Sequence, residues 1–595
     1  MHPNPDSRRR GALRSGVAGA VLAFLTLSGV QALALRPYLP PDELYHAGYV
    51  ATVLDGRLPT LTTPVPAGRV PLMPADDRPR RVYVANHPPL FYLVTAAPLW
   101  FGERLGGPRA GFLAARLLSA LLAAGGLVLV AWLALLLVPG RPRVAVGAAW
   151  LAALLPSLPH VAAFVYNDGL GFLAATAALA AAVLVIRHGP SPRRLAAMAA
   201  AAGAAALTRA PGLAMVAVAA AAAAAGVLLH GRRPPLRRAL LAAGAGTLVG
   251  GVAGGAAIGF YLRNRSLYGS LTGAAYNQQL FGFKPQDHVL ELLGSPAYAL
   301  RLYDGLWAWT RFNLPRVPIP PVLVAVPRVL ALAALAGLAV GAADGLRALH
   351  RPAAGDLAAA AAWTLAVGWG AGVYLMVAAY DGHGGHTHPR YLFPGLAVLA
   401  VAAALGLDRL PGARRGLWIW AATVAQLTLT GVAWASFVTA LRGRRPGSPG
   451  DLAGAVAGLL EAGGVRWPWV VLTMAALLLA VALALLGLAL ARIRPQPPDR
   501  PGVGRGTPGE RSETDLGGGQ PVRHATSSAT PMPAARREPD GRLLHGGVAA
   551  GGQLRRQKGS TWVLDLDGDR RAVRYLPPPQ RTRPSPFSGG GRRRR

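Results

Sequence analysis

The feature that most constrains this chain is a series of long apolar runs separated by short segments that carry arginine. The hydrocarbon core of a bilayer requires about 20 consecutive apolar residues in a helix. Apolar runs of roughly this kind occur at 15–35, 113–138, 143–163, 169–186, 195–208, 211–229, 239–262, 322–343, 357–379, 391–407, 416–440 and 468–491. The sequence therefore predicts an all-α, polytopic membrane protein with about 12 transmembrane helices, in a multi-span domain over 15–494.

The positive charge lies mostly outside these runs and predicts their orientation. The chain carries 61 Lys and Arg residues against 26 Asp and Glu residues. Basic residues collect in short cytoplasmic loops, so the arginines within 1–14 predict a cytoplasmic N-terminus. The alternate loops up to 408–415 repeat the pattern, whereas the predicted outer loop 441–466 is also basic. Because the charge lies in loops and tail, we expect membrane lipids as partners and no nucleic acid.

Two segments near the N-terminus allow more than one interpretation. The run 15–35 ends near Ala32-Leu33-Ala34, which fits a signal-peptide cleavage site, but it is longer than the usual 7–15 residues. We expect a retained helix. The segment 88–105 is apolar but contains three prolines, and counting it as a span would move every later basic loop outside. We therefore expect it to be interfacial or re-entrant on the outer side, within a first extracytoplasmic loop at 36–112.

The last hundred residues differ in composition from the rest. Segment 495–595 is rich in Gly, Pro, Ser and Arg and lacks hydrophobic periodicity, so we expect a disordered cytoplasmic tail whose arginines meet anionic lipid. One stretch, 561–576, predicts a hairpin around Asp567-Gly568. The chain has no cysteine, which excludes disulfides and thiolate chemistry. Arginine largely replaces lysine, which suggests a GC-rich bacterial genome and hence the plasma membrane of a bacterium.

The predicted outer loops hold the candidate site residues. Asp42 and Glu43 follow the first span and could act as a general base or bind a divalent cation such as Mg²⁺ or Mn²⁺. The alternative is that Asp42 caps a helix that begins near Glu43. Asn167 and Asp168 precede the next candidate span, where they either cap it or add an acidic group. Arg209 lies at an outer boundary, and either binds phosphate or snorkels to lipid.

A further loop, 380–390, contains three histidines close in sequence. His383, His386 and His388 could hold a metal together with Asp381, or could belong to a polar loop that meets water or substrate. Arg390-Tyr391 follows and is another candidate phosphate contact. The later outer loop, 263–321, is long and rich in Tyr and Trp, which suits sugar stacking or an interfacial belt.

These motifs together resemble those of the GT-C superfamily of membrane glycosyltransferases, including the protein O-mannosyltransferase and aminoarabinose-transferase types. The resemblance covers about residues 15–440. It rests on Asp42-Glu43, the segment 86–92 (NHPPLFY), Asn167-Asp168, Thr208-Arg209 and the segment 390–394 (RYLFP), in that order. The PPDE-x-x-H form of 40–46 is similar to that of a poorly characterised bacterial branch. The sequence departs from the superfamily where Arg209 replaces the typical lysine, and in the basic stretch 78–81.

The resemblance implies transfer of a sugar from a polyprenyl-phosphate donor to an acceptor glycan, lipid or protein. It implies catalytic roles for Asp42, Glu43 and Asp168. The substrate-binding residues expected beside them are His46, His87, Asn167, Arg209, His386, His388, Arg390 and Tyr391. The competing hypothesis is a transporter or flippase for a lipid-linked or polar solute. Such proteins tend to have internal repeats and broken helices at mid-membrane, and we find no repeat between the halves of this chain.

Overall fold

A computed structural model describes most of the membrane domain and a small part of the C-terminal segment. The described residues are 5–40, 42–70, 72–73, 80–282, 289–308, 319–348, 354–385, 388–410, 416–443, 445–493, 554–556, 561–566 and 569–574. The chain divides into two compact units, Met1–Pro501 and Gly502–Arg595. Each is described by itself below.

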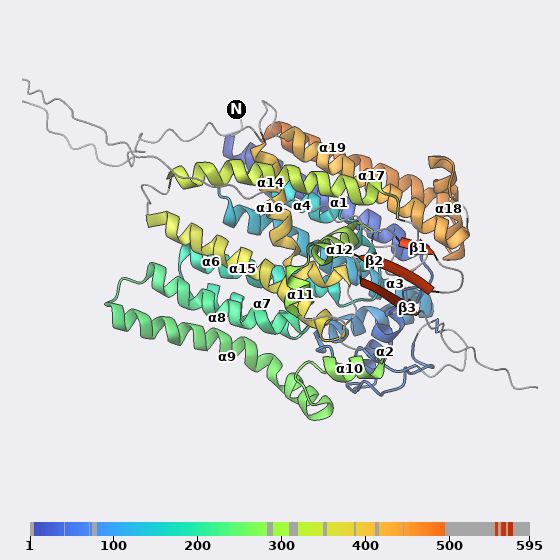
Figure 1. Cartoon of the computed structure of the whole chain (residues 1–595), viewed down its shortest axis with the longest axis horizontal. Helices are drawn as coiled ribbons and strands as arrows, with labels where there is room; N and C mark the ends of the chain where they lie inside the picture. Colours follow the sequence, from blue (N-terminus) through green and yellow to red (C-terminus); the bar gives the residue numbers. More distant parts are fainter. Residues whose placement is uncertain are drawn as a thin grey trace, which may run out of the picture. The chain divides into compact units, whose positions relative to one another are not determined.

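The first unit is a bundle of long apolar helices (Figure 1). Ten of the described helical segments are long and apolar enough to cross a membrane. They lie in α1 (Pro5–Ala34), α3 (Leu90–Leu137), α6 (Asp168–His188), α8 (Pro211–His230), α9 (Pro235–Tyr268), α14 (Val322–Ala348), α15 (Ala354–Gly382), η1 with α16 (Pro389–Gly395 and Leu396–Arg409), α17 (Gly416–Arg442) and α19 (Pro468–Arg492). The prediction of an all-α, polytopic membrane protein is confirmed.

Two predicted spans are shorter in the structure than the sequence suggests. The run 143–163 forms α4 (Pro142–Ala153) and α5 (Ser157–Ala162), and the break between them precedes Pro156. Proline lacks an N–H and disfavours helix in the residue before it, which explains the break. Both helices are buried, and irregular backbone is tolerated at membrane depth where protein surrounds it. The run 195–208 forms α7 (Pro192–Ala206), of 15 residues.

Helix α3 bends sharply and its first part folds back on its second. Gly106 and Gly107 have non-helical backbone angles, and Gly107 has φ of 77°. A Cβ added to Gly102 would lie 2.7 Å from the Cα of Gly111, although nine residues of straight helix would separate these positions by roughly 13 Å. The segment 90–105 is therefore a separate helical arm. That 88–105 is interfacial or re-entrant on the outer side stays a prediction.

The two predicted outer loops, 36–112 and 263–321, pack against each other. The first contains α2 (Glu43–Leu54), and the second contains α10 (Ala274–Leu280), α11 (Val289–Gly294) and α12 (Pro296–Trp307). The Asn86 side chain donates a hydrogen bond to the Thr272 carbonyl at 3.0 Å, and the Tyr268 hydroxyl accepts one from the Leu61 N–H at 3.0 Å. Figure 1 shows α2 and α10 at the same end of the bundle.

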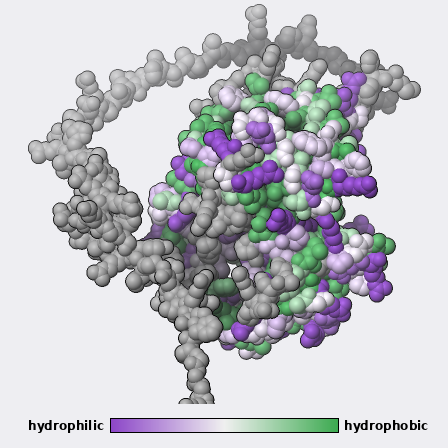
Figure 2. Space-filling model, turned by 90° about the vertical axis from the view of Figure 1, so that its right-hand side faces the viewer, coloured by the Kyte–Doolittle hydropathy of each residue, from purple (hydrophilic) through white to green (hydrophobic). Residues whose placement is uncertain are grey.

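The surface of the bundle differs between its sides and its end. Large apolar side chains are exposed along the outer helices, for example Leu240 on α9, Leu332 on α14 and Leu477 on α19. Figure 2 views the bundle from the end where α2 and α18 (Pro449–Ala462) lie, and shows hydrophilic side chains scattered between hydrophobic ones. Apolar sides and a mixed end are what a membrane-embedded bundle requires.

The described part of the second unit is a three-stranded antiparallel sheet in the order β1 (Leu554–Arg556), β2 (Thr561–Leu566) and β3 (Asp569–Arg574). The strands β2 and β3 form the hairpin that was predicted around Asp567-Gly568. The disorder expected for the rest of 495–595 concerns residues that lie outside the described part.

Candidate active site

Asp42 precedes α2 and points its carboxylate away from that helix. Its carbonyl oxygen accepts hydrogen bonds from the backbone N–H groups of Tyr45 and His46, both at 3.1 Å, but its side chain makes no cap hydrogen bond. The carboxylate instead accepts hydrogen bonds from the Tyr83 hydroxyl and from Nη2 of Arg390. The side chain does not cap the helix, and the alternative interpretation of Asp42 is wrong in this respect.

Four charged side chains predicted from separate segments form one chain of alternating charge. Arg390, in η1, pairs with Asp42 through Nη2, and its Nη1 lies 4.0 Å from Oδ2 of Asp168. Asp168, in the first turn of α6, accepts a hydrogen bond from Nη1 of Arg209, in the turn between α7 and α8. The order is Asp42, Arg390, Asp168, Arg209. The structure thus brings together residues up to 348 positions apart in the sequence.

Aromatic rings enclose the two arginines of this chain of charges. The guanidinium carbon of Arg390 lies 4.8 Å from the centre of the Tyr166 ring, and that of Arg209 lies 5.5 Å from the Tyr391 ring. Asp168 is buried, whereas the side chain of Asp42 keeps 23% of its surface exposed. The exposed carboxylate is therefore the member of the chain that an incoming hydroxyl reaches most easily.

The surroundings of Asp42 lower its pKa. Burial alone would raise the pKa of this carboxyl, but the positive charge of Arg390 and the hydrogen bond from the Tyr83 hydroxyl together lower it below its usual value. At neutral pH Asp42 is therefore an anion held by a cation, which makes it a weak base in this state.

Glu43 lies beside Asp42 in sequence but faces the interior. Oε1 accepts hydrogen bonds from Nε of Arg116 (2.8 Å) and the Val165 N–H (3.1 Å), and Oε2 accepts from Nη2 of Arg116 (2.7 Å) and the Tyr38 N–H (3.0 Å). A carboxylate offers about four lone-pair positions, and all are used here. Glu43 is fully buried.

Arg116 was not identified from the sequence, although it lies a few residues inside a predicted span. It donates further hydrogen bonds to the carbonyls of Ala32, Leu35 and Arg36 at the end of α1. A charged residue inside an apolar span generally has a specific partner, and this was the available signal. Through these contacts, the Glu43–Arg116 pair holds α1, α2 and α3 together.

His46 and His87 lie next to the charged chain. Their rings are nearly parallel with centres 6.1 Å apart, and Nδ1 of His46 lies 3.0 Å from the Tyr92 hydroxyl. Burial lowers the pKa of both, and Arg209 and Arg390 add to this effect at His87, whose pKa falls to about 3. Both imidazoles are therefore neutral at physiological pH and can exchange hydrogen bonds with an uncharged ligand.

The remaining predicted site residues lie close by, with one exception. The Asn167 side chain donates to the Thr208 carbonyl at 3.3 Å, which fixes the turn that carries Arg209. Nδ1 of His388 accepts a hydrogen bond from the Arg390 N–H at 3.3 Å. His386 lies outside the described residues.

The predicted cation does not fit the carboxylates as they are arranged. The oxygens of Asp42 face Tyr83 and Arg390, and those of Glu43 face four other donors. Within the described residues, no group of three or more His, Cys, Asp or Glu side chains is placed to hold a metal ion.

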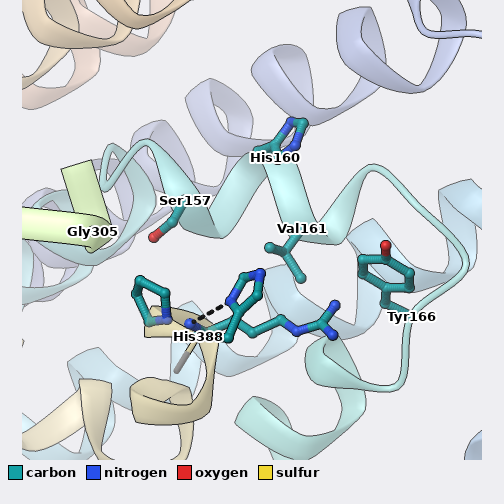
Figure 3. A pocket seen from close by; sticks show the side chains of 8 residues that line it. Ser157, His160, Val161, Tyr166, Gly305 and His388 are labelled. Atoms are coloured by element: carbon teal, nitrogen blue, oxygen red, sulfur yellow. Dashed lines mark hydrogen bonds between the residues drawn. The ribbon is translucent and has the colours of Figure 1, made fainter. Parts of the chain in front are cut away.

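A pocket adjoins the charged chain on the far side of Arg390. It is lined by Ser157, His160, Val161, Tyr166, Gly305, His388, Pro389 and Arg390, and encloses about 290 Å³, including space that opens to solvent (Figure 3). Neither Ser157 nor Tyr166 was predicted as a site residue. Asp42 does not line this pocket.

No protein-family model and no curated protein matches this sequence. Its structure is similar to that of ArnT from Cupriavidus metallidurans, with 19% identity and a TM-score of 0.43 in the apo state, covering 81% of this chain and 76% of that one. ArnT bound to undecaprenyl phosphate gives 17% identity and a TM-score of 0.41, covering 80% and 74%.

It is also similar to the oligosaccharyltransferase AglB from Archaeoglobus fulgidus in complex with an inhibitory peptide and a dolichol-phosphate. The identity is 15% and the TM-score 0.38, covering 72% of this chain and 58% of that one. These likenesses concern the fold alone.

Proposed function

We propose that this protein is a glycosyltransferase that moves a sugar from a polyprenyl-phosphate donor to an acceptor hydroxyl on the outer face of a bacterial plasma membrane, with both termini in the cytoplasm. The observation that carries the proposal is the contact between Asp42 and Arg390. It places a carboxylate with an exposed edge against a cation suited to phosphate. The arginine-bearing inner loops of the sequence support the orientation.

The proposed reaction is a single displacement at the anomeric carbon of the donor sugar. The acceptor oxygen forms a bond to this carbon, and its proton passes to Asp42. The bond between the anomeric carbon and the phosphate oxygen breaks, and the polyprenyl phosphate leaves with the bonding electrons. Arg390 and Arg209 stabilise the negative charge that grows on the phosphate. Asp168, which lies against both guanidiniums, holds them in position.

The donor must bind before Asp42 becomes an effective base. In the unliganded arrangement Arg390 lowers the pKa of Asp42. A donor phosphate that binds Arg390 competes with Asp42 for the same donor atoms, so the pKa of Asp42 rises toward its usual value. An acceptor that arrives without a donor therefore meets a weak base.

Other predicted residues support these groups. We propose that Glu43 and Arg116 are positioning residues that fix the backbone at Asp42, so the expected catalytic role for Glu43 becomes an indirect one. The neutral rings of His46 and His87 and the Tyr391 side chain, which covers Arg209, are placed to contact a substrate.

The test is transfer of radiolabelled sugar from a panel of polyprenyl-phosphate sugars in membranes that contain the protein or its Asp42→Asn variant. We expect the variant to lose at least about 100-fold in rate, since a positioned general base contributes 10²–10⁴-fold. Asp55→Asn is the matched control. Asp55 lies in the same loop and pairs with Arg69 at 2.9 Å, away from the charged chain.

Full activity in Asp42→Asn would exclude Asp42 as the base. Absence of transfer from every donor by folded, inserted wild-type protein would instead favour the transporter hypothesis, which a solute-flux assay would then address.

A further inference from the structure

A second cavity lies where α17 and α18 meet. Val438 and Arg442 are four residues apart near the end of α17, so they share one face of that helix. Asp451 and Ala455 have the same spacing near the start of α18. The residues that line the cavity are Val438, Arg442, Arg445, Pro446, Asp451 and Ala455.

The size of this cavity suits one small polar group. The space open to water is about 110 Å³, against about 10 Å³ by the same measure in the pocket beside Arg390. One water molecule requires about 10–15 Å³, whereas sites for whole small molecules enclose roughly 300–1,000 Å³. Nearly all of the surface that lines the cavity is polar. The occupant that fits is therefore a polar group larger than water and smaller than a complete ligand.

The two arginines of the cavity are held differently. Nη2 of Arg442 donates a hydrogen bond to the Ala455 carbonyl at 2.9 Å, and the missing side chain of Gly458 leaves room for this guanidinium against α18. Arg445 has no hydrogen bond or ion pair within the described part of the chain. One guanidinium is thus anchored in the wall, while the other is available to a ligand.

Asp451 also lines the cavity, but its carboxylate is held by the backbone. Oδ2 accepts hydrogen bonds from the N–H groups of Gly447 and Ser448 at 3.0 and 3.1 Å. Among the described residues, no ion pair joins this carboxylate to Arg442 or Arg445. Two cations therefore share the cavity with one anion that already has partners, and a further anion is the ligand that balances them.

The cavity lies at one end of the membrane-spanning bundle. Helix α17 is long and apolar enough to cross a membrane and ends at Arg442. Gly463, just past α18, packs so closely on the Leu33 carbonyl, in the last turn of α1, that a Cβ there would overlap it. Figure 1 shows α18 at this end of the bundle. Trp467 and Trp469, at the start of α19, are 63% and 57% exposed, and tryptophan is enriched at the level of the lipid headgroups.

We propose that this cavity binds a phosphate group, and that the source of this group is the headgroup of an anionic membrane lipid. Arg442 and Arg445 donate to the phosphate oxygens, which guanidinium groups match well. The headgroup level of the cavity favours a lipid over soluble phosphate. A bound phosphate also accounts for the basic loop 441–466, which departs from the charge pattern of the other predicted outer loops and takes no part in the proposed sugar transfer.

The test measures lipid binding to the purified, delipidated full-length protein in detergent by native mass spectrometry. The probes are phosphatidylglycerol and a diacylglycerol with the same acyl chains, which lacks the phosphate. We expect one phosphatidylglycerol to bind at least about tenfold more tightly than diacylglycerol. Arg445→Gln should remove about tenfold of this affinity, the lower end of what a hydrogen bond to a charged group contributes. Adding Arg442→Gln should reduce the affinity to that of diacylglycerol.

Arg466→Gln is the matched control, because it removes one positive charge from the same loop. Arg466 is exposed, stacks on Trp467 at 5.4 Å and does not line the cavity, so this variant should bind phosphatidylglycerol as the wild type does. Arg445→Gln breaks no contact of the described residues, so it should elute as the wild type does in size-exclusion chromatography. Equal affinity in wild type and Arg445→Gln would overturn the proposal. Equal losses in Arg445→Gln and Arg466→Gln would also overturn it, since the effect would then be one of overall charge.

Inorganic phosphate distinguishes the two sources of the group. Its binding would be measured by equilibrium dialysis with radiolabelled phosphate on the same protein samples. Arg445-dependent binding of inorganic phosphate without any preference for phosphatidylglycerol would keep the phosphate site but overturn the lipid as its source. Binding of neither probe would overturn the whole proposal. Both measurements proceed without turnover, so their outcome is independent of whether the protein transfers a sugar.

Discussion

Replacing Glu43 by Gln tests whether this residue acts in the chemistry or in the architecture. Glu43 accepts four hydrogen bonds, two of them from Arg116, and the two side chains are 0% and 2% exposed. Glutamine has one carbonyl oxygen with two lone pairs, so two of the four donors would face its NH₂ group. An unsatisfied buried donor costs about 1–3 kcal/mol, so two cost about 2–6 kcal/mol. Breaking a buried ion pair costs about 3–5 kcal/mol, in agreement.

The assay compares unfolding in detergent, followed by tryptophan fluorescence, with sugar transfer per mole of folded protein. We expect Glu43→Gln to lower the free energy of unfolding by about 3–5 kcal/mol. Sugar transfer should fall only to the extent that the loss of the Glu43 contacts moves Asp42. The double variant Glu43→Leu with Arg116→Met leaves no unpaired buried charge, so it should be at least as stable as Glu43→Gln. Glu461→Gln, at an exposed position on α18, should change stability by less than about 0.5 kcal/mol. Unchanged stability together with abolished transfer in Glu43→Gln would refute this reasoning and return Glu43 to the chemistry.

Three further predictions follow from the geometry. A Cβ at Gly111 would lie 2.6 Å from the Leu99 carbonyl oxygen, so Gly111→Val should prevent the fold-back of α3 and reduce the yield of monodisperse protein. Gly251→Val is the control and should leave the yield unchanged, because a Cβ at Gly251 would have no atom within 4 Å. The pKa of His87 is about 3 in the folded protein, whereas an unfolded chain has the ordinary histidine value of about 6.5. Only the unfolded state takes up this proton between these values, so the free energy of unfolding should fall as the pH drops below 6.5. His87→Gln should make that loss shallower when the unfolding midpoint is measured between pH 7.5 and 5, and an unchanged slope would contradict the assignment. Tyr83→Phe removes a hydrogen bond that lowers the pKa of Asp42, so this pKa should rise. The acidic limb of the rate–pH profile should then move to higher pH, and an unmoved limb would exclude this effect.

Much of the membrane fold could be predicted because one physical rule governs it. A bilayer requires long apolar helices, and these stand out in any sequence. The rule fails where protein rather than lipid surrounds a helix. The buried pair α4 and α5 is apolar enough to resemble a span, yet it is broken before Pro156 because neighbouring helices shield the exposed backbone.

The candidate site, too, could be predicted only in part. Asp42, Asp168, Arg209 and Arg390 could be identified because each is charged and lies at an outer end of an apolar run. Their mutual pairing could not, since no local pattern relates positions hundreds of residues apart. The positioning role proposed for Glu43 could not be predicted for the same reason. Its partner, Arg116, lies on another helix, and only the tertiary structure shows that all four acceptor positions of Glu43 are used.

The separation of 348 residues between Asp42 and Arg390 has a consequence for biosynthesis. At about 5–20 residues per second, a ribosome takes roughly 17–70 s to reach Arg390 after it has made Asp42. During that interval the loop that carries Asp42 has left the ribosome while its cation has not been made. Under the proposed function, a nascent or prematurely terminated chain has Asp42 without Arg390, and cannot consume a lipid-linked donor before η1 is in place.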